Sequence, residues 1–301
     1  MVIPALVVAL VLGGVWFVAR ARRALAVERE LAIRLPVGDD GFVIDGGPIR
    51  LEGAGRNRAV LLLHGFGDTP QTLEYLAGRL RADDWNVVAP ALPGHARTIR
   101  EFARSTADDW LAAARREFEA LRLTHDEVAV VGLSMGGALA SVLAADDTTL
   151  PALVLLAPYL AMSRRVRRFS RLHALLALWR AYVFGRSVRS IRDPLERSRN
   201  RAYGYTPPAT LHELWRVVRW ARGAAPRIVA PTLVIVSRQD NRIASPDAEA
   251  AFGLIGSPEK RIVWIEGAGH VITVDYGRDE VIEQTRDWLR RHSAQGERRQ
   301  S

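Results

Sequence analysis

Six short apolar runs without regular polar alternation most constrain what this chain can fold into. Each run spans seven residues, and longer helical patterns separate most of them. They are AVLLLHG (59–65), NVVAPAL (86–92), VAVVGLS (128–134), ALVLLAP (152–158), TLVIVSR (232–238) and RIVWIEG (261–267). Strands that are covered by helices on both faces have this continuous apolar character. Their alternation with helices predicts a doubly wound α/β fold with a mostly parallel sheet and right-handed crossovers.

Helix signals occupy the stretches between these runs. Residues 69–83 open with a threonine and a proline, which favour the N-cap and the first helical position. Residues 106–123 carry apolar residues at helical spacing, and a closing helix is expected over 279–292. The segment 42–52, around the turn residues DGGP, is a candidate for an N-terminal hairpin. The core domain is predicted to comprise two parts of the chain, 42–160 and 223–292.

The chain opens with an apolar run, residues 2–19, that contains no charged side chain. As a helix, this run would rise about 27 Å, close to the ~30 Å hydrocarbon core of a bilayer. Three arginines follow within RARR (20–23), and no basic residue precedes the run. We therefore predict a single-pass membrane anchor over 1–23, with the folded domain in the cytoplasm, and a tether over 24–41. The alternatives are a signal peptide cleaved near ALA (24–26), which would leave a secreted or periplasmic domain, and a buried core helix.

Residues 161–222 interrupt the alternation of strands and helices. They hold 15 arginines and three acidic residues, a balance of +12, which leaves the rest of the chain near −3 (9 − 12). Leucines and aromatic residues recur among the arginines, so we predict a cap of amphipathic helices without a strand, inserted after Ala157. Either its apolar faces cover the core while its arginines are solvated, or the cap meets anionic lipid head groups at a membrane. No recognition motif accompanies the charge, so no nucleic-acid partner is expected. The polar tail, 293–301, is expected to be flexible.

The stretch VVGLSMGGALA (130–140) places a serine after a predicted strand and before a predicted helix. Gly132, Ser134 and Gly136 match G-x-S-x-G, the nucleophile elbow, in which the glycines leave room for a sharp turn and the serine is held exposed. Amides at the start of the following helix favour developing negative charge. We predict that Ser134 is a nucleophile; the alternative is a turn with a purely structural role.

A serine hydroxyl attacks when a base accepts its proton, and a histidine held by a carboxylate can serve as that base. His270 follows the predicted strand 261–267 in a loop with two glycines, and Asp240 follows the end of the predicted strand 232–238. The order nucleophile, acid, base along the chain fits a nucleophile elbow. The rival residues are expected in a helix cap, in the loop after the base, in the cap insertion or in the last helix: Asp247, Asp275, His173, His212 and His292.

A developing oxyanion needs two backbone donors. One is expected from Met135, the residue after the nucleophile. The other is expected from Phe66, in the loop HGFGDTP (64–70) that follows the first predicted strand. His64 precedes Ser134 in the chain, and we expect it to brace this loop rather than to act as the base.

The sequence excludes several kinds of chemistry. Cysteine is absent, so disulfides and thiolate catalysis are excluded. The chain has no HExxH motif, no cluster of histidines and carboxylates at metal-ligand spacing, and no Rossmann or P-loop glycine pattern. We therefore expect neither a metal nor another cofactor.

Five motifs make the chain similar to a known family: HGFGDTP (64–70), APALPGHA (89–96), GLSMGG (132–137), SRQDNRI (237–243) and GAGHVITVD (267–275). Over residues 58–290 the chain resembles the α/β-hydrolase superfamily, specifically bacterial carboxylesterases and monoacylglycerol lipases. The resemblance implies an α/β-hydrolase fold with a helical cap. It assigns the catalytic and oxyanion roles to residues already singled out: Ser134, Asp240, His270, Phe66 and Met135. We also expect substrate contacts from four residues: Gly65, Phe66, Tyr159 and Trp179.

The implied reaction is acyl transfer to water through an acyl-enzyme, with an acylglycerol or another lipid-like ester as the substrate. A thioesterase, an acyltransferase or a peptidase could use the same residues. A non-catalytic membrane-anchored binding protein is the alternative from a different class. The expected partners are a small-molecule ester or lipid and a membrane, contacted through the N-terminal helix and, in one of the two alternatives above, through the basic cap.

Overall fold

The structure is a computed structural model that describes residues 2–54, 57–185 and 190–293. The side chains of residues 2–6, 8, 9, 164 and 165 are also outside the description. The tail that the sequence predicts to be flexible, 293–301, lies outside the described residues except for Ser293.

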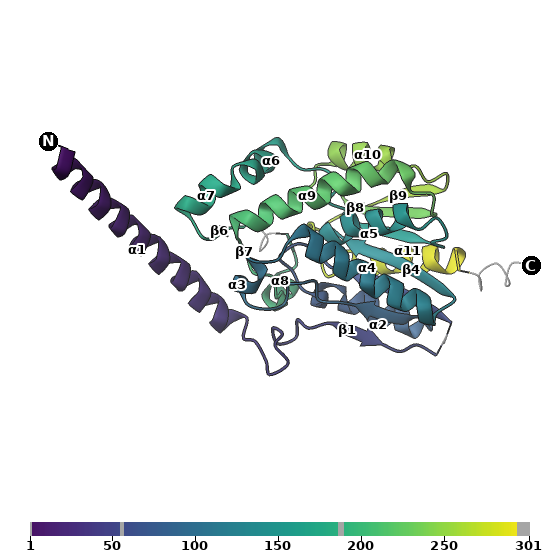
Figure 1. Ribbon diagram of the computed structural model, residues 1–301. Helices are drawn as coiled ribbons and strands as arrows, with labels where there is room; N and C mark the ends of the chain where they lie inside the picture. The colour runs from purple at the N-terminus through teal and green to yellow at the C-terminus, as the bar shows by residue number, and fades with distance from the viewer. Residues whose placement is uncertain (1, 55–56, 186–189, 294–301) are drawn as a thin grey trace, which may run out of the picture.

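A seven-stranded sheet occupies the centre of the fold, with helices on both of its faces (Figure 1). Its spatial order is β1-β3-β2-β4-β5-β8-β9. The strands are β1 (Ile49–Leu51), β2 (Arg58–Leu63), β3 (Asn86–Ala89), β4 (Glu127–Leu133), β5 (Leu153–Leu156), β8 (Thr232–Ser237) and β9 (Lys260–Ile265). β1 pairs antiparallel with β3, and the other neighbours pair parallel. The predicted doubly wound, mostly parallel sheet is therefore confirmed.

The helices of the core lie in two layers. They are η1 (Pro70–Leu73), α2 (Glu74–Ala82), α3 (Ile99–Phe102), α4 (Ala107–Thr124), α5 (Met135–Asp146), η3 (Ala225–Arg227), α10 (Ser245–Leu254) and α11 (Arg278–Arg291). Residues of α4, α5 and α10 pack against one face of the sheet, and residues of α2 and α11 pack against the other. Because both faces are covered, β2, β4, β5 and β8 are almost wholly buried, which explains their continuous apolar sequence.

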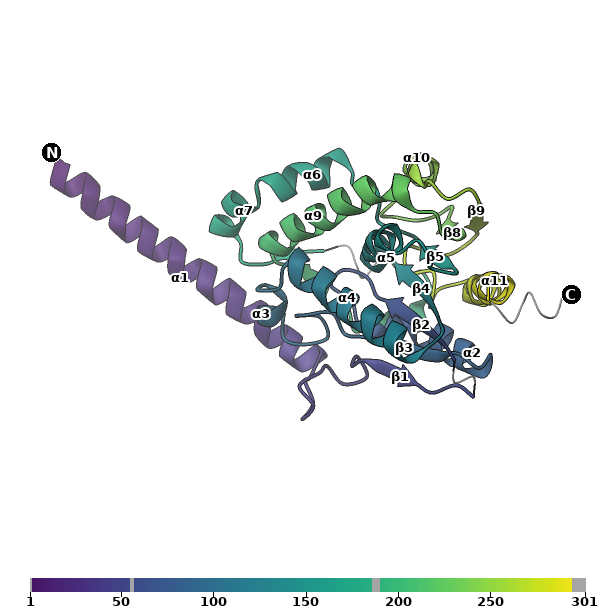
Figure 2. The same ribbon diagram turned by 45° about the vertical axis from the view of Figure 1, so that its right-hand side comes forward.

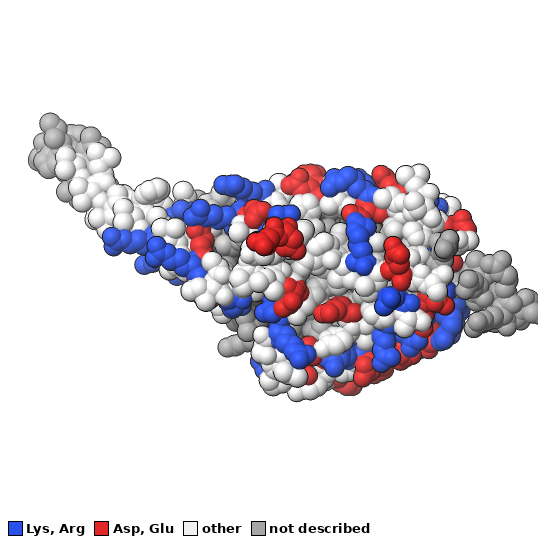
Figure 3. Space-filling view, turned by 90° about the horizontal axis from the view of Figure 1, so that it is seen from below, with Lys and Arg blue, Asp and Glu red and all other residues white. Residues whose placement is uncertain are grey.

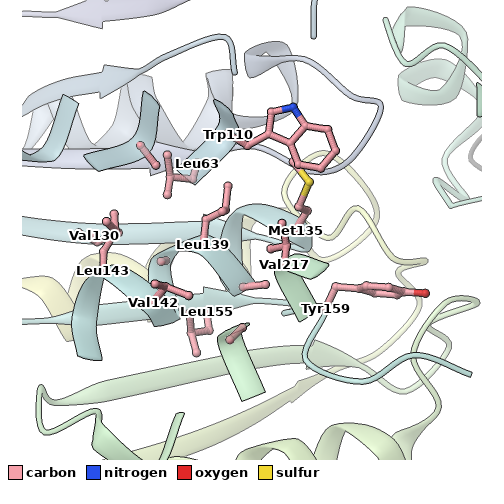
Figure 4. Close-up of a cluster of buried hydrophobic side chains, with 14 of the residues drawn as sticks. Leu63, Trp110, Val130, Met135, Leu139, Val142, Leu143, Leu155, Tyr159 and Val217 are labelled. Carbon is pink, nitrogen blue, oxygen red and sulfur yellow. The ribbon is translucent and has the colours of Figure 1, made fainter. Parts of the chain in front are cut away.

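Successive strand residues divide between the two cores. Val130 points to the core shared with α4 and α5, whereas Val131 points to the opposite one, as the two-residue period of a strand requires. Figure 4 shows part of the first core, where Val130 of β4 lies beside Leu143 of α5 and Leu155 of β5 lies beside Val142 of α5. Packing on both faces buries β4, and the candidate nucleophile Ser134 follows its carboxyl end.

The cap leaves the sheet after β5 and returns before β8. Its elements are α6 (Arg164–Arg171), α7 (His173–Trp179), β6 (Val183–Phe184), α8 (Pro194–Arg199), β7 (Tyr205–Thr206) and α9 (Pro208–Ala224). α9 lies between α5 of the core and the pair α6–α7, as Figure 2 shows. The prediction that this region lacks strands was wrong, because β6 and β7 form a short antiparallel pair. A pair of two-residue strands is too short to give a recognisable sequence period.

The N-terminal part of the chain forms one helix, α1 (Val2–Arg34), which is continuous across the expected boundary between anchor and tether. Leu31 and Leu35, at its carboxyl end, are buried in the core. Its other end extends away from the body (Figures 1 and 2). Figure 3 shows basic side chains gathered where α1 meets the body, whereas both signs of charge are mixed over the core.

Two expectations for the N-terminal region are not supported. The predicted membrane anchor, 1–23, falls partly outside the described residues, and no described helix has a stretch long and apolar enough to cross a membrane. The prediction of a hairpin over 42–52 is wrong, because β1 pairs with β3 rather than with an adjacent strand.

The start of α5 approaches β2 so closely that Gly136 has no room for a side chain. A Cβ atom there would overlap the carbonyl oxygen of Leu63, which belongs to the backbone and cannot rotate away. We expect Gly136→Ala to lower the free energy of unfolding by about 3 kcal/mol or more, measured by urea denaturation.

Gly78→Ala provides the matched control. Gly78 lies inside α2, and a Cβ atom there would meet no atom within 4 Å. Because alanine favours a helix interior over glycine, this variant should gain about 0.5–1 kcal/mol. Equal effects of the two substitutions would contradict the close approach of α5 to β2.

Candidate active site

Ser134 occupies a strained turn between β4 and α5. Its backbone angles are φ 55° and ψ −113°, a region that residues other than glycine rarely adopt. Its N–H donates to the carbonyl of Leu156 at 2.9 Å, and its carbonyl accepts from the N–H of Tyr159 at 3.0 Å. Gly132 and Gly136 lie so close to the neighbouring backbone that neither could carry a side chain. The surrounding structure therefore holds the strained serine in place.

His270 lies in the loop after β9, beside the hydroxyl of Ser134. The distance from His270 Nε2 to Ser134 Oγ is 2.8 Å, and Nδ1 of the same ring lies 2.7 Å from Asp240 Oδ2. Both distances are those of hydrogen bonds. If Nδ1 carries the proton donated to Asp240, Nε2 is free to accept the serine proton. The three groups form one chain along which a proton can leave the hydroxyl.

Asp240 is held by the turn that follows β8. Its Oδ1 atom accepts from the backbone N–H groups of Arg242, at 2.6 Å, and Ile243, at 3.0 Å. Burial opposes ionisation of this carboxyl. The positive charge and hydrogen bond of His270, together with the two amides, outweigh burial and hold the pKa of Asp240 below its ordinary value. The carboxylate is therefore charged where it can stabilise a protonated His270.

The rival acids lie elsewhere. Asp247 is in the first turn of α10. Asp275 is buried, and its two oxygens accept from four backbone N–H groups at 2.6–2.8 Å: those of Arg192, Asp193, Gly269 and Tyr276. Asp275 therefore ties the loop that carries His270 to the cap segment before α8. This role of Asp275 could not be predicted from the sequence, since no sequence pattern marks an acceptor for amides that lie more than eighty residues away.

The loop after β2 lies against the serine. A Cβ atom on Gly65 would be 3.5 Å from Ser134 Cβ. The backbone of Gly65, the residue before Phe66, therefore passes close to Ser134. Met135 begins α5 directly after Ser134. Among the described residues, neither the Phe66 nor the Met135 amide finds a hydrogen-bond acceptor. Two amides near one serine are the arrangement that an oxyanion hole requires.

His64 is hydrogen-bonded to the backbone of the loop after β2, which agrees with the expectation that it braces this loop. Its Nδ1 lies 2.9 Å from the carbonyl oxygen of Gly65, and its Nε2 accepts from the N–H of Leu92 at 3.1 Å. Because it is fully buried, the pKa of His64 is lowered to about 4. A neutral ring with both nitrogens engaged can fix the loop and has no free nitrogen for catalysis.

Ser134 and His270 open into a cavity of about 540 Å³ between the sheet and the cap. Its walls are mostly apolar, and they include six apolar side chains from the cap: Val166, Phe169, Leu176, Val183, Phe184 and Leu211. The predicted contact residues Gly65, Phe66 and Tyr159 line this cavity. An enclosed apolar wall next to a nucleophile is suited to an aliphatic chain.

Trp179, the fourth residue expected to contact substrate, does not line the cavity. Its side chain is 68% exposed and meets Trp16 of α1 edge to face, with ring centroids 6.2 Å apart. α7 directs Leu176 inward and Trp179 outward, so the expectation for Trp179 is not supported. Among the described residues, no group of three or more metal-ligating side chains could hold a metal ion.

Asp68 is a buried carboxyl in the cavity wall that the sequence analysis did not single out. Its Oδ1 atom accepts from the N–H of Thr69 at 2.9 Å. Burial raises its pKa to about 7, against the opposing effects of the Thr69 amide and the Asn200 side chain. The sequence signal that could have identified Asp68 is that it is the one acidic residue in the glycine-containing loop HGFGDTP (64–70).

Asp275→Ala tests the support of the His270 loop. Loss of four backbone hydrogen bonds should let this loop shift, and a displacement of about 1 Å at a catalytic base typically costs about 100-fold in rate. We therefore expect about 100-fold lower kcat/KM and a lower Tm. Asp279→Ala, at an exposed aspartate in the first turn of α11, is the control. Wild-type kinetics in Asp275→Ala would show that the loop holds its position without this carboxylate.

Asp68→Asn tests the buried carboxyl through the pH dependence of stability. The unfolded chain releases the Asp68 proton near pH 4, whereas the folded protein keeps it until about pH 7. The wild-type free energy of unfolding should therefore fall, relative to that of the variant, as pH rises from 4 to 7. The limit is about 1.4 kcal/mol per pH unit, and the difference should be constant above pH 7. A difference that does not vary with pH, measured by urea denaturation at four pH values, would contradict the raised pKa.

Comparison with known proteins gives matches to both relatives and solved structures. The chain is 29% identical over 259 residues to the thermostable monoacylglycerol lipase of Bacillus sp. (strain H-257), covering 85% of this chain and 96% of that protein. It is 27% identical over 238 residues to a carboxylesterase of Bacillus subtilis (strain 168), covering 78% and 93%. A solved structure from the metagenome-derived lipolytic enzymes LipS and LipT superposes with a TM-score of 0.73 at 28% identity, covering 82% and 98%.

A family model described as serine aminopeptidase, S33, matches residues 55–276, which include the elbow, the Asp240 turn and the His270 loop. The match spans most of the chain. The chain therefore belongs to the serine aminopeptidase, S33, family of α/β-hydrolase-fold serine hydrolases.

Proposed function

We propose that this protein hydrolyses carboxylic esters through Ser134, His270 and Asp240. The observation that carries the proposal is the hydrogen-bonded chain from Ser134 Oγ through His270 to Asp240, with distances of 2.8 and 2.7 Å, at the floor of an apolar cavity. The three residues come from loops after three different strands. A turn with a purely structural role would not need all three in contact.

The proposed reaction has two steps. Ser134 Oγ attacks the ester carbonyl carbon while His270 Nε2 takes the hydroxyl proton. The negative charge on the carbonyl oxygen is stabilised by the Phe66 and Met135 amides, and Asp240 stabilises the protonated imidazole. His270 then gives the proton to the leaving alcohol, and an acyl-enzyme remains. Water, deprotonated by His270, attacks the acyl carbon and releases the acid and the free serine.

The cavity supports an acylglycerol or another lipid-like ester as the substrate. Its volume of about 540 Å³ and its leucine, valine and phenylalanine walls fit an aliphatic acyl chain better than a polar group. The names of the relatives, monoacylglycerol lipase and carboxylesterase, point to the same bond type. The family description, aminopeptidase, makes amide hydrolysis the alternative that an assay should include.

Ser134→Ala tests the nucleophile. We expect hydrolysis of p-nitrophenyl esters and monoacylglycerols to fall by at least about 10⁴-fold, and labelling by a fluorophosphonate probe to disappear. Ser141→Ala is the matched control, since Ser141 is a buried serine of α5 whose hydroxyl donates to the carbonyl of Gly137. Folded wild-type protein that neither reacts with the probe nor cleaves any ester would refute the proposal. Faster cleavage of aminoacyl amides than of esters would favour the alternative.

A further inference from the structure

The carboxyl half of α1 lies against the cap and against α3, although these segments are far apart in the sequence (Figures 1 and 2). The contacts are polar and specific. They involve Arg20, Glu28, Glu30 and Arg34 on the α1 side. We name these four residues the strap.

Glu28 joins the cap to the core. Its Oε1 atom accepts from the hydroxyl of Tyr182 at 2.7 Å, and its Oε2 atom lies 2.6 Å from the guanidinium of Arg100 in α3. The hydrogen bond from Arg100 is the largest influence on Glu28 and, against the opposing effect of burial, lowers its pKa. Because the glutamate is charged, both contacts are stronger than bonds between neutral groups.

Glu30 and Arg34 hold the strand that faces β6. The carboxylate of Glu30 accepts from the hydroxyl of Tyr205 at 2.7 Å, and the guanidinium of Arg34 donates to the carbonyl of Tyr203. Tyr203 also donates its own N–H to the carbonyl of Gly67 at 3.0 Å, in the loop beside the serine. The strap therefore contacts the β6–β7 pair. Through Tyr203 it is also connected to the loop 64–70, which contains Phe66.

Arg20 fastens α7. Its guanidinium donates twice to the carbonyl of Ala177, at 3.0 and 2.7 Å, close to the contact between Trp16 and Trp179. This carbonyl belongs to the residue next to Leu176, which lines the cavity.

Each contact of the strap with the cap lies at, or next to, a residue of the cavity wall. Tyr182 precedes Val183, Tyr203 precedes Gly204, and Ala177 follows Leu176, while Tyr205 itself lines the cavity. These segments therefore line the cavity that contains Ser134, and the same segments are hydrogen-bonded to α1. The β6–β7 pair is only two residues long in each strand, so its own ladder gives it little rigidity.

We propose that Glu28 and Glu30 are positioning residues that fix the β6–β7 wall and thereby set the preference of the cavity for long acyl chains. The inference rests on the proposed ester hydrolysis for its kinetic consequence. Short esters occupy only the space beside Ser134, so they need no support from this wall. Long chains extend along the wall and bind well only when it is ordered.

The test compares Glu28→Ala/Glu30→Ala with Arg29→Ala in the full chain. Arg29 lies between the two glutamates, is exposed, and forms no hydrogen bond or ion pair with the described residues. For the double variant we expect KM for p-nitrophenyl dodecanoate to rise about three- to tenfold, with kcat nearly unchanged. Hydrolysis of p-nitrophenyl acetate should stay within about twofold of wild type, and Arg29→Ala should behave like wild type with both esters.

Hydrogen exchange gives a readout that does not depend on activity. The amide of Gly185 donates to the carbonyl of Gly204 at 2.7 Å, at the end of the β6–β7 pair. Its exchange should accelerate in the double variant and not in Arg29→Ala. If no ester is cleaved by wild-type protein, the proposed function fails, and the exchange rates alone decide whether α1 orders the wall.

Two outcomes would overturn the inference. One is unchanged exchange at Gly185 in the double variant. The other is faster exchange at Gly185 in a double variant that is active but keeps the wild-type preference between the dodecanoate and acetate esters. If the double variant does not fold, Tyr182→Phe replaces it. This change removes the cap hydroxyl that donates to Glu28 and keeps the ring, and the same two outcomes then apply.

Discussion

The parallel pairing of β4, β5, β8 and β9 is the constraint on which the rest of the structure depends. β4 leads to Ser134, β8 to Asp240 and β9 to His270, and the ladders align these strands so that their carboxyl ends share one edge. Side chains separated by up to 136 positions therefore meet within hydrogen-bonding distance. The energy that holds this edge together comes from the apolar packing of helices against both faces of the sheet. The site itself can then carry a strained serine and a buried carboxylate without endangering the fold.

Much of this arrangement could be read from the sequence, because it follows from local patterns. The six apolar runs match β2, β3, β4, β5, β8 and β9 to within a few residues. The glycines around Ser134 predicted a turn that the backbone angles now show. Asp240 and His270 were chosen because each follows a strand end, and parallel strands bring such positions together. Their catalytic roles, like those of Phe66 and Met135, stay predictions until variants are measured.

The features that could not be predicted depend on contacts between distant segments. Trp179 was expected in the cavity because it is aromatic, yet α1 provides it with a neighbour outside the cavity. Asp275 reads as an ordinary loop residue until the amides of 192–193 are placed beside it. The β6–β7 pair has no period to detect, and the contacts of α1 with the cap join residues more than 150 positions apart. Each case requires the tertiary arrangement, which neither propensity nor spacing contains.

The place where the cap joins the sheet has a consequence for how such a protein can change. β5 and β8 are hydrogen-bonded neighbours, so residues 157–231 leave and re-enter the sheet at adjacent points. The pairing of these two strands does not require any particular intervening chain. Substitution, lengthening or wholesale exchange of this segment can alter which molecules are admitted while the proton-transfer apparatus stays in register. Selectivity and reactivity can therefore evolve, or be engineered, as separate modules of one polypeptide.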